Sequence, residues 1–164
     1  MSIFTNLDRF VHLISGDILS DLIDTLSGCG ELLREYHLKH LTDSKDIFHA
    51  RVTCVFTSIE ITSQLGRVVE LDDKESIFML YQLFLDICRN PSVAQELSKQ
   101  DQELLVKAVA KIFIQKRQLS LETTASFVKI FLDCSMKLGQ EASGFIKTLL
   151  FITKLMIQVI SILL

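Results

Sequence analysis

Amphipathic helical patterning with very few breaks is the feature that most constrains this sequence. One proline, Pro91, and six glycines occur in 164 residues, so there are few positions at which a helix must end. Hydrophobic residues make up 49% of the chain and recur at helical rather than strand spacing. This pattern predicts an all-α fold in which helices pack on helices.

Length and charge limit the class of protein. A chain of 164 residues can form one domain with a substantial core, and we expect a single helical-repeat domain over 1–164. The net charge is −3, with 17 Lys and Arg against 20 Asp and Glu, which does not indicate a dedicated nucleic-acid-binding protein. This balance leaves room for a local basic patch on the surface. The first nine residues lack the basic start and apolar run of a signal peptide.

The four cysteines, Cys29, Cys54, Cys88 and Cys134, are widely spread. No C-x-x-C pair occurs, so zinc-ribbon and thioredoxin-like sites have no support. Three of the four lie in apolar helical stretches, where we expect them to pack as small hydrophobic side chains. This usage indicates a reducing compartment, either cytosol or nucleus.

Polar turns divide the chain into successive helices. Gly28-Cys29-Gly30 predicts the clearest loop, and Asn90-Pro91 the strongest boundary, since Asn suits an N-cap and Pro the first helical position. Ser120 is expected to cap a helix that Gly139 ends. The predicted helices cover about residues 3–14, 17–27, 31–41, 45–65, 73–89, 92–115 (with an alternative break near 99–101), 121–138 and 140–164.

The predicted helices form sequential antiparallel pairs of about 40 residues, a length that matches HEAT-like or armadillo-like units. We therefore favour an α-solenoid. The sequence shows no residue-level internal repeat, and a compact irregular bundle remains the alternative.

The segment 145–164 is 20 residues long, which is enough to span a bilayer. Lys147 and Lys154 interrupt it, and a lysine near the membrane midplane costs about 2.5–3.5 kcal/mol. We therefore favour a core helix whose covering neighbour is absent over a tail anchor. This interpretation predicts a truncated superhelix with an exposed apolar end.

The sequence contains no pattern that indicates catalysis. His37 and His40 form H-x-x-H, but metalloprotease chemistry needs two histidines four apart with a Glu between them. Lys39 lies between these two and would repel a cation, so we expect a solvated helix face. Neither a Gly-rich elbow nor a phosphate-binding glycine loop is present. We expect no enzymatic activity, metal, cofactor or small-molecule substrate.

A basic run over 111–118 contains Lys111, Lys116 and Arg117. Cations at the C-terminal end of a helix complement its macrodipole, which is one interpretation of the run. The alternative is contact with RNA phosphates, which carries no base specificity.

Several segments, in order, resemble one known family. Residues 112–120 (IFIQKRQLS) followed by 125–131 (ASFVKIF) look like a helix that ends in a basic turn and then a helix with an F-[IV]-K pattern. Residues 10–14 (FVHLI) followed by 21–23 (DLI) look like F-x-H-L-I with a downstream D-L-L. Together they resemble the C-terminal CCAAT-binding-factor-type helical-repeat region of the third nucleolar complex protein family, over roughly residues 5–155.

This resemblance implies a non-enzymatic scaffold for assembly of the large ribosomal subunit in the nucleolus. Its implied partners are the second nucleolar complex protein and the pre-60S particle with its precursor rRNA, and family members are also linked to DNA replication initiation. The basic turn is thinner than the family's Lys/Arg cluster, and the chain ends at Leu164 where the family continues. Two other functions stay open: a cytosolic armadillo-like adaptor, and a membrane protein anchored through residues 145–164.

Overall fold

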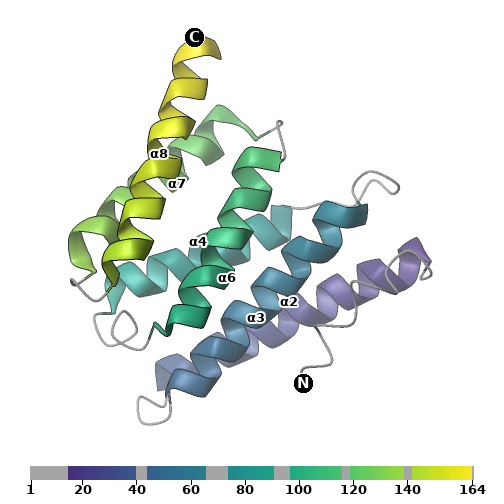
Figure 1. Ribbon diagram of the computed structural model, residues 1–164. Helices are drawn as coiled ribbons and strands as arrows, with labels where there is room; N and C mark the ends of the chain where they lie inside the picture. Colours follow the sequence, from purple (N-terminus) through teal and green to yellow (C-terminus); the bar gives the residue numbers. More distant parts are fainter. Residues whose placement is uncertain are drawn as a thin grey trace. The chain divides into compact units, whose positions relative to one another are not determined.

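The computed structural model describes residues 15–39, 44–65, 74–90, 97–115, 119–138 and 142–163 (Figure 1). These residues are almost entirely helical, and no strand occurs among them, which confirms the all-α prediction. The predicted helix 3–14 lies outside the described residues. The helices are α2 (Gly16–Lys39), α3 (Ser44–Leu65), α4 (Lys74–Arg89), α6 (Lys99–Ala110), the π-helical turn η2 (Lys111–Gln115), α7 (Leu121–Lys137) and α8 (Ser143–Leu163).

The chain forms two compact units, Met1–Leu80 and Tyr81–Leu164. The division falls inside α4, so the first turns of this helix belong to one unit and the remainder to the other. The prediction of one domain over 1–164 stays a prediction.

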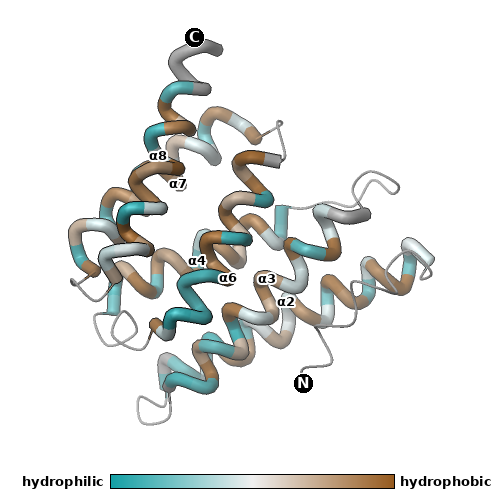
Figure 2. Tube along the Cα trace, in the orientation of Figure 1, coloured by the Kyte–Doolittle hydropathy of each residue, from teal (hydrophilic) through white to brown (hydrophobic). Residues whose placement is uncertain are grey.

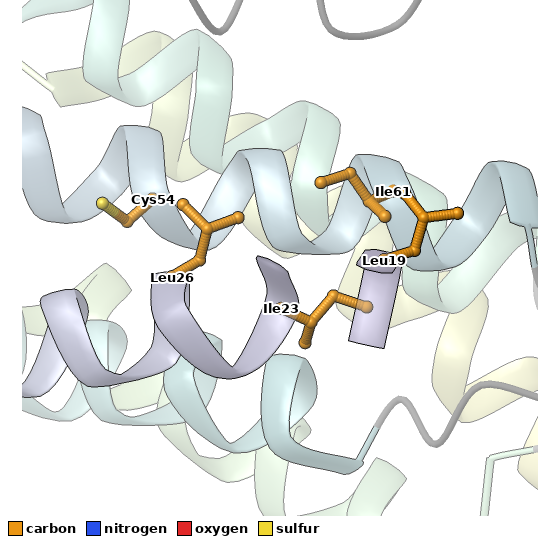
Figure 3. Packing of buried hydrophobic residues seen from close by; sticks show 5 residues of the cluster. All are labelled: Leu19, Ile23, Leu26, Cys54 and Ile61. Carbon is orange, nitrogen blue, oxygen red and sulfur yellow. The ribbon is translucent and has the colours of Figure 1, made fainter. Parts of the chain in front are cut away.

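In the first unit, α2 packs along α3. One stripe of α2 supplies Leu19, Ile23 and Leu26, which meet Cys54 and Ile61 of α3 in a buried apolar cluster (Figure 3). The spacing of four and three residues brings these α2 side chains onto one helix face. Full burial of each such leucine or isoleucine contributes about 1.5–3 kcal/mol to stability.

The first turns of α4 join this unit through two polar contacts, one buried and one part-buried. The Ser27 hydroxyl donates a hydrogen bond to a carboxylate oxygen of Glu75, and the hydroxyls of Ser58 and Ser76 lie 2.6 Å apart. Both pairs give partners to side chains that the packing removes from water, as buried polar groups require.

The predicted loop at Gly28-Cys29-Gly30 is wrong, because α2 continues through it to Lys39. Glycine costs about 1 kcal/mol against alanine inside a helix, and the packing of α2 on α3 outweighs that penalty. Gly30 also has a packing role, since a Cβ there would lie 3.4 Å from the sulfur of Met79. The helix ends predicted at residues 27 and 31 are therefore absent.

In the second unit, aromatic side chains from α4, η2, α7 and α8 form the core. The rings of Phe84 and Phe131 lie edge to face at 4.8 Å, and those of Phe113 and Phe127 at 4.9 Å. Phe145 of α8 stacks parallel to Phe84 at 6.3 Å. Such ring pairs add about 0.5–1.5 kcal/mol each beyond the burial of their area.

Two helix starts in this unit follow from N-caps. Ser98 caps α6 in a capping box with Asp101, so a helix begins at Lys99. Residues 91–96 lie outside the described residues, so a break in the predicted helix 92–115 stays a prediction. Ser120 caps α7, as predicted, by accepting a hydrogen bond from the Thr123 amide.

Candidate functional surfaces

The basic run is the first candidate site. Lys111 begins η2, is half-buried, and its amide donates to the Ala108 and Lys107 carbonyls at the end of α6. Lys116 and Arg117 lie outside the described residues. The turn is anchored on its inner side, because Ile112 is buried and the neighbouring Phe113 packs on α7. Contact of these three cations with RNA stays a prediction.

The π-helical turn itself is a local irregularity that the sequence did not predict. Single π-turns inside or at the end of α-helices occur often at functional sites. Here η2 follows α6 directly and forms residues 111–115 of the basic run.

His37 is buried rather than solvated, so the predicted solvated face of the H-x-x-H pair is wrong at this position. Its side chain is 2% exposed, and its ring lies 6.1 Å from that of Phe48 in α3. The physical reason is register, because His37 continues the core stripe that runs through Ile23 and Leu26 at intervals of three and four. That spacing is the signal that could have located it. His40 lies outside the described residues.

Arg51 is a second buried polar side chain that the sequence did not indicate. It is 2% exposed, and its guanidinium carbon lies 6.0 Å from the Phe48 ring centre, a cation–π arrangement. The His37 Nδ1 and Arg51 Nη1 atoms accept or donate no hydrogen bond, although both side chains make further interactions. Among the described residues no three His, Cys, Asp or Glu side chains group as metal ligands.

Cys88 of α4 and Cys134 of α7 form a disulfide with a Cα–Cα distance of 5.2 Å. Both cysteines are buried, as expected of small hydrophobic side chains, but the sequence did not predict that they pair. Disulfides persist mainly in oxidising compartments, so the bond gives no support to the reducing compartment expected from cysteine spacing.

The same geometry also suits the reduced form. Cys88 Sγ lies 3.7 Å from the Ile130 carbonyl oxygen, and Cys134 Sγ lies 3.5 Å from that of Phe84. Each sulfur thus faces the carbonyl four residues before the other cysteine. As thiols, both sulfurs could donate to these carbonyls, whereas in the disulfide neither carries the necessary proton.

The remaining two cysteines are free and differ in environment. Cys29 is exposed on α2, and Cys54 is buried in α3. Burial, and secondly the nearby Cys29, raise the pKa of the Cys54 thiol from its ordinary value of 9.0. Cys54 thus behaves as the predicted small hydrophobic side chain.

The last helix has one buried and one exposed face. Leu149, Ile152 and Met156 are buried where α8 contacts α6 and α7. On the opposite face Leu150, Phe151 and Ile157 are 43%, 61% and 49% exposed. Figure 2 shows hydrophilic residues interrupting the hydrophobic ones along this helix.

This arrangement bears on the predicted exposed apolar end and on the membrane alternative. The exposed apolar face matches what a core helix without a covering neighbour would present. Among the described residues, no helix has both the length and the apolar content to cross a bilayer.

Comparison with known proteins finds no relative of this chain. No family model, no curated protein and no solved structure matches it.

Proposed function

We propose that this chain is a non-enzymatic scaffold that takes part in assembly of the large ribosomal subunit in the nucleolus. The observation that carries the proposal is the ordered resemblance of residues 5–155 to the third nucleolar complex protein family. The all-α fold is compatible with the helical repeats of that family, and we propose that the helices stack as an α-solenoid.

The mechanism we propose is display of surfaces rather than chemistry. Buried leucine, isoleucine and phenylalanine side chains hold the helices of each unit, and the exposed faces are left for partners. The second nucleolar complex protein would be the protein partner. Lys111, Lys116 and Arg117 would contact phosphates of precursor rRNA, with no base specificity.

Affinity purification of the tagged chain from nuclear extract tests the proposed function, with bound RNA and protein identified together. We expect recovery of precursor rRNA of the large subunit together with nucleolar complex proteins. Recovery of neither, or of membrane proteins instead, would contradict the proposal.

The basic run is tested separately by charge reversal. Lys116→Glu with Arg117→Glu should weaken crosslinking to precursor rRNA and leave the melting temperature unchanged. Lys129→Glu, an exposed lysine on α7, is the matched control and should leave crosslinking unchanged. A large fall in melting temperature for the double variant would show that the run is structural.

One observation favours a second candidate function, an armadillo-like adaptor that binds a protein segment. The exposed apolar face of α8 supplies a surface of the kind that helices bind. An adaptor of this kind would bind protein without nucleolar enrichment or precursor rRNA, so the same purification distinguishes the two functions.

A further inference from the structure

The exposed face of α8 combines apolar and cationic side chains in one stripe. We define the α8 outer stripe as Lys147, Leu150, Phe151, Lys154 and Ile157, all of which are exposed. Their spacing of three and four residues aligns them along one side of the helix. At 1.5 Å per residue the stripe is about 15 Å long, or nearly three turns, which is enough for one partner helix to lie against it.

The stripe is not used by the packing of its own unit. The core side chains of α8 leave from the opposite face, and the helix contacts α6 and α7 through that face. Exposed phenylalanine, leucine and isoleucine side chains gain free energy when a partner covers them, at about 25 cal/mol for each Å² removed from water. The apolar members of the stripe therefore supply affinity for an occupant.

The charges of α8 indicate the chemistry of that occupant. The helix contains two lysines and no aspartate or glutamate. Lys147 and Lys154 are both exposed and are seven residues apart, so two turns of helix separate their ammonium groups. A surface with cations at this spacing and apolar side chains between them is complementary to a helix with carboxylates seven residues apart and leucines between them.

Two other occupants fit the stripe less well. In a second copy paired through the same stripe, lysines would face lysines, because α8 contributes no carboxylate to oppose them. A membrane-surface helix carries its lysines beside the apolar face. Here Lys154 lies within the stripe, with Phe151 before it and Ile157 after it, so that insertion would take its ammonium into the acyl region.

We propose that the α8 outer stripe binds an acidic amphipathic helix of a partner protein. The apolar side chains bury against the partner, and Lys147 and Lys154 set its register by pairing with carboxylates. This site deepens the scaffold role proposed above and rests on it, since it names the surface through which the scaffold holds a protein partner.

A designed peptide is the probe for this site. It is a fluorescein-labelled helix of three heptads with leucines on one face and glutamates seven residues apart beside them, and its matched control has lysine in place of each glutamate. With the full chain, fluorescence anisotropy should give binding of the glutamate peptide and at least tenfold weaker binding of the lysine peptide.

Reversing the charges of the two lysines tests whether they select the acidic peptide. Lys147→Glu with Lys154→Glu should weaken binding of the glutamate peptide at least tenfold and restore binding of the lysine peptide. Phe151→Ser should weaken binding of both peptides. Lys129→Glu and Phe78→Ser alter an exposed lysine and an exposed phenylalanine on other helices and should change neither affinity.

The α8 site would be wrong if the two peptides bound equally well, or if the glutamate peptide did not bind. It would also be wrong if the stripe served another occupant. Self-association of the chain that Phe151→Ser abolishes would indicate a second copy, and binding to vesicles of phosphatidylcholine and phosphatidylserine through Lys147 and Lys154 would indicate a membrane surface. If the chain purifies with precursor rRNA but fails these tests, the α8 site is wrong and the scaffold role stands. If the peptide binds but no ribosomal precursor is recovered, the scaffold role in ribosome assembly is wrong.

Discussion

Gly28 and Gly30 lie in the middle of α2, but their surroundings differ. Gly28 is exposed, and a Cβ there would meet nothing within 4 Å, whereas a Cβ at Gly30 would meet the sulfur of Met79. No glycine among the described residues has a positive φ. Both positions are therefore compatible with an L-residue, and only Gly30 has a neighbour that limits the size of its side chain.

Gly28→Ala should raise the free energy of unfolding by about 1 kcal/mol, because alanine loses less backbone entropy than glycine when a helix forms. Urea denaturation followed by circular dichroism measures this change. Gly30→Ala is the matched control and should gain less, since the Met79 side chain must adjust. A loss of stability in Gly28→Ala would show that the helix is broken there.

The four cysteines should separate into three classes of reactivity. We expect iodoacetamide to alkylate Cys29 first in the native protein, because Cys29 is exposed and Cys54 is buried. Mass spectrometry locates the alkylated residues. Cys54 should react only when the chain unfolds, and Cys88 and Cys134 only after reduction. Rapid reaction of all four thiols in the unreduced native protein would contradict both the burial and the disulfide.

The raised pKa of Cys54 also makes a prediction about pH. Folding favours the neutral thiol over the thiolate. Below pH 9.0 the thiol is neutral in both the folded and the unfolded chain, so its full contribution to the free energy of unfolding is present. Above pH 9.0 the unfolded chain ionises first, and this contribution is lost as the pH rises. The free energy of unfolding should fall more steeply in alkaline solution for the native sequence than for Cys54→Ala. Equal slopes would show that Cys54 is not desolvated by folding.

Among the helices of the second unit, α4 and α7 are joined by several specific side-chain contacts. It combines the disulfide with the Phe84–Phe131 ring pair and a hydrogen bond of 3.0 Å from Lys137 Nζ to the Cys88 carbonyl oxygen. The ammonium group at the end of α7 thus satisfies a carbonyl in the last turn of α4, where the helix dipole is negative.

Reduction of the Cys88–Cys134 bond should lower the melting temperature. The bond closes a loop with a sequence separation of 46, for which chain entropy gives a stabilisation of about 4 kcal/mol. Thermal unfolding with and without a phosphine reductant measures the difference. Cys88→Ala with Cys134→Ala should abolish the response to reductant, while a response that persists in this variant would place the effect elsewhere.

Helix existence was predictable from the sequence where a cap or a strong apolar stripe marked it. The helices α3, α4 and α7 and the Ser120 cap were found in this way. The continuous α2 was not, because glycine propensity favours a loop and the compensating contacts come from α3. The same limit hid the Cys88–Cys134 pair, whose members are far apart in sequence and meet only through packing.

The candidate sites were predictable only in part, for a related reason. The sequence shows that Lys147 and Lys154 are charged residues within an otherwise apolar segment. The structure places both on the exposed face of α8. The burial of His37 and Arg51 was not predicted. The spacing of the α2 core stripe carries a signal for His37, whereas arginine is mostly exposed in proteins and Arg51 is buried by tertiary packing.

The whole molecule is an all-α chain that forms two compact units. Each unit has its own core: the first contains an aliphatic cluster between α2 and α3, and the second is rich in phenylalanine. We propose that its function lies in its outer surfaces, namely the basic run at 111–118 and the α8 outer stripe. We propose that both surfaces bind partners, the first through phosphates and the second through a protein helix.

Sedimentation of the tagged chain from nuclear extract through a sucrose gradient tests the proposed role in ribosome assembly. We expect the chain to co-sediment with the precursor rRNA of the large subunit and to move to the top of the gradient after ribonuclease treatment. A chain that stays at the top of the gradient without ribonuclease, or that sediments with membranes, would contradict the proposed role in ribosome assembly.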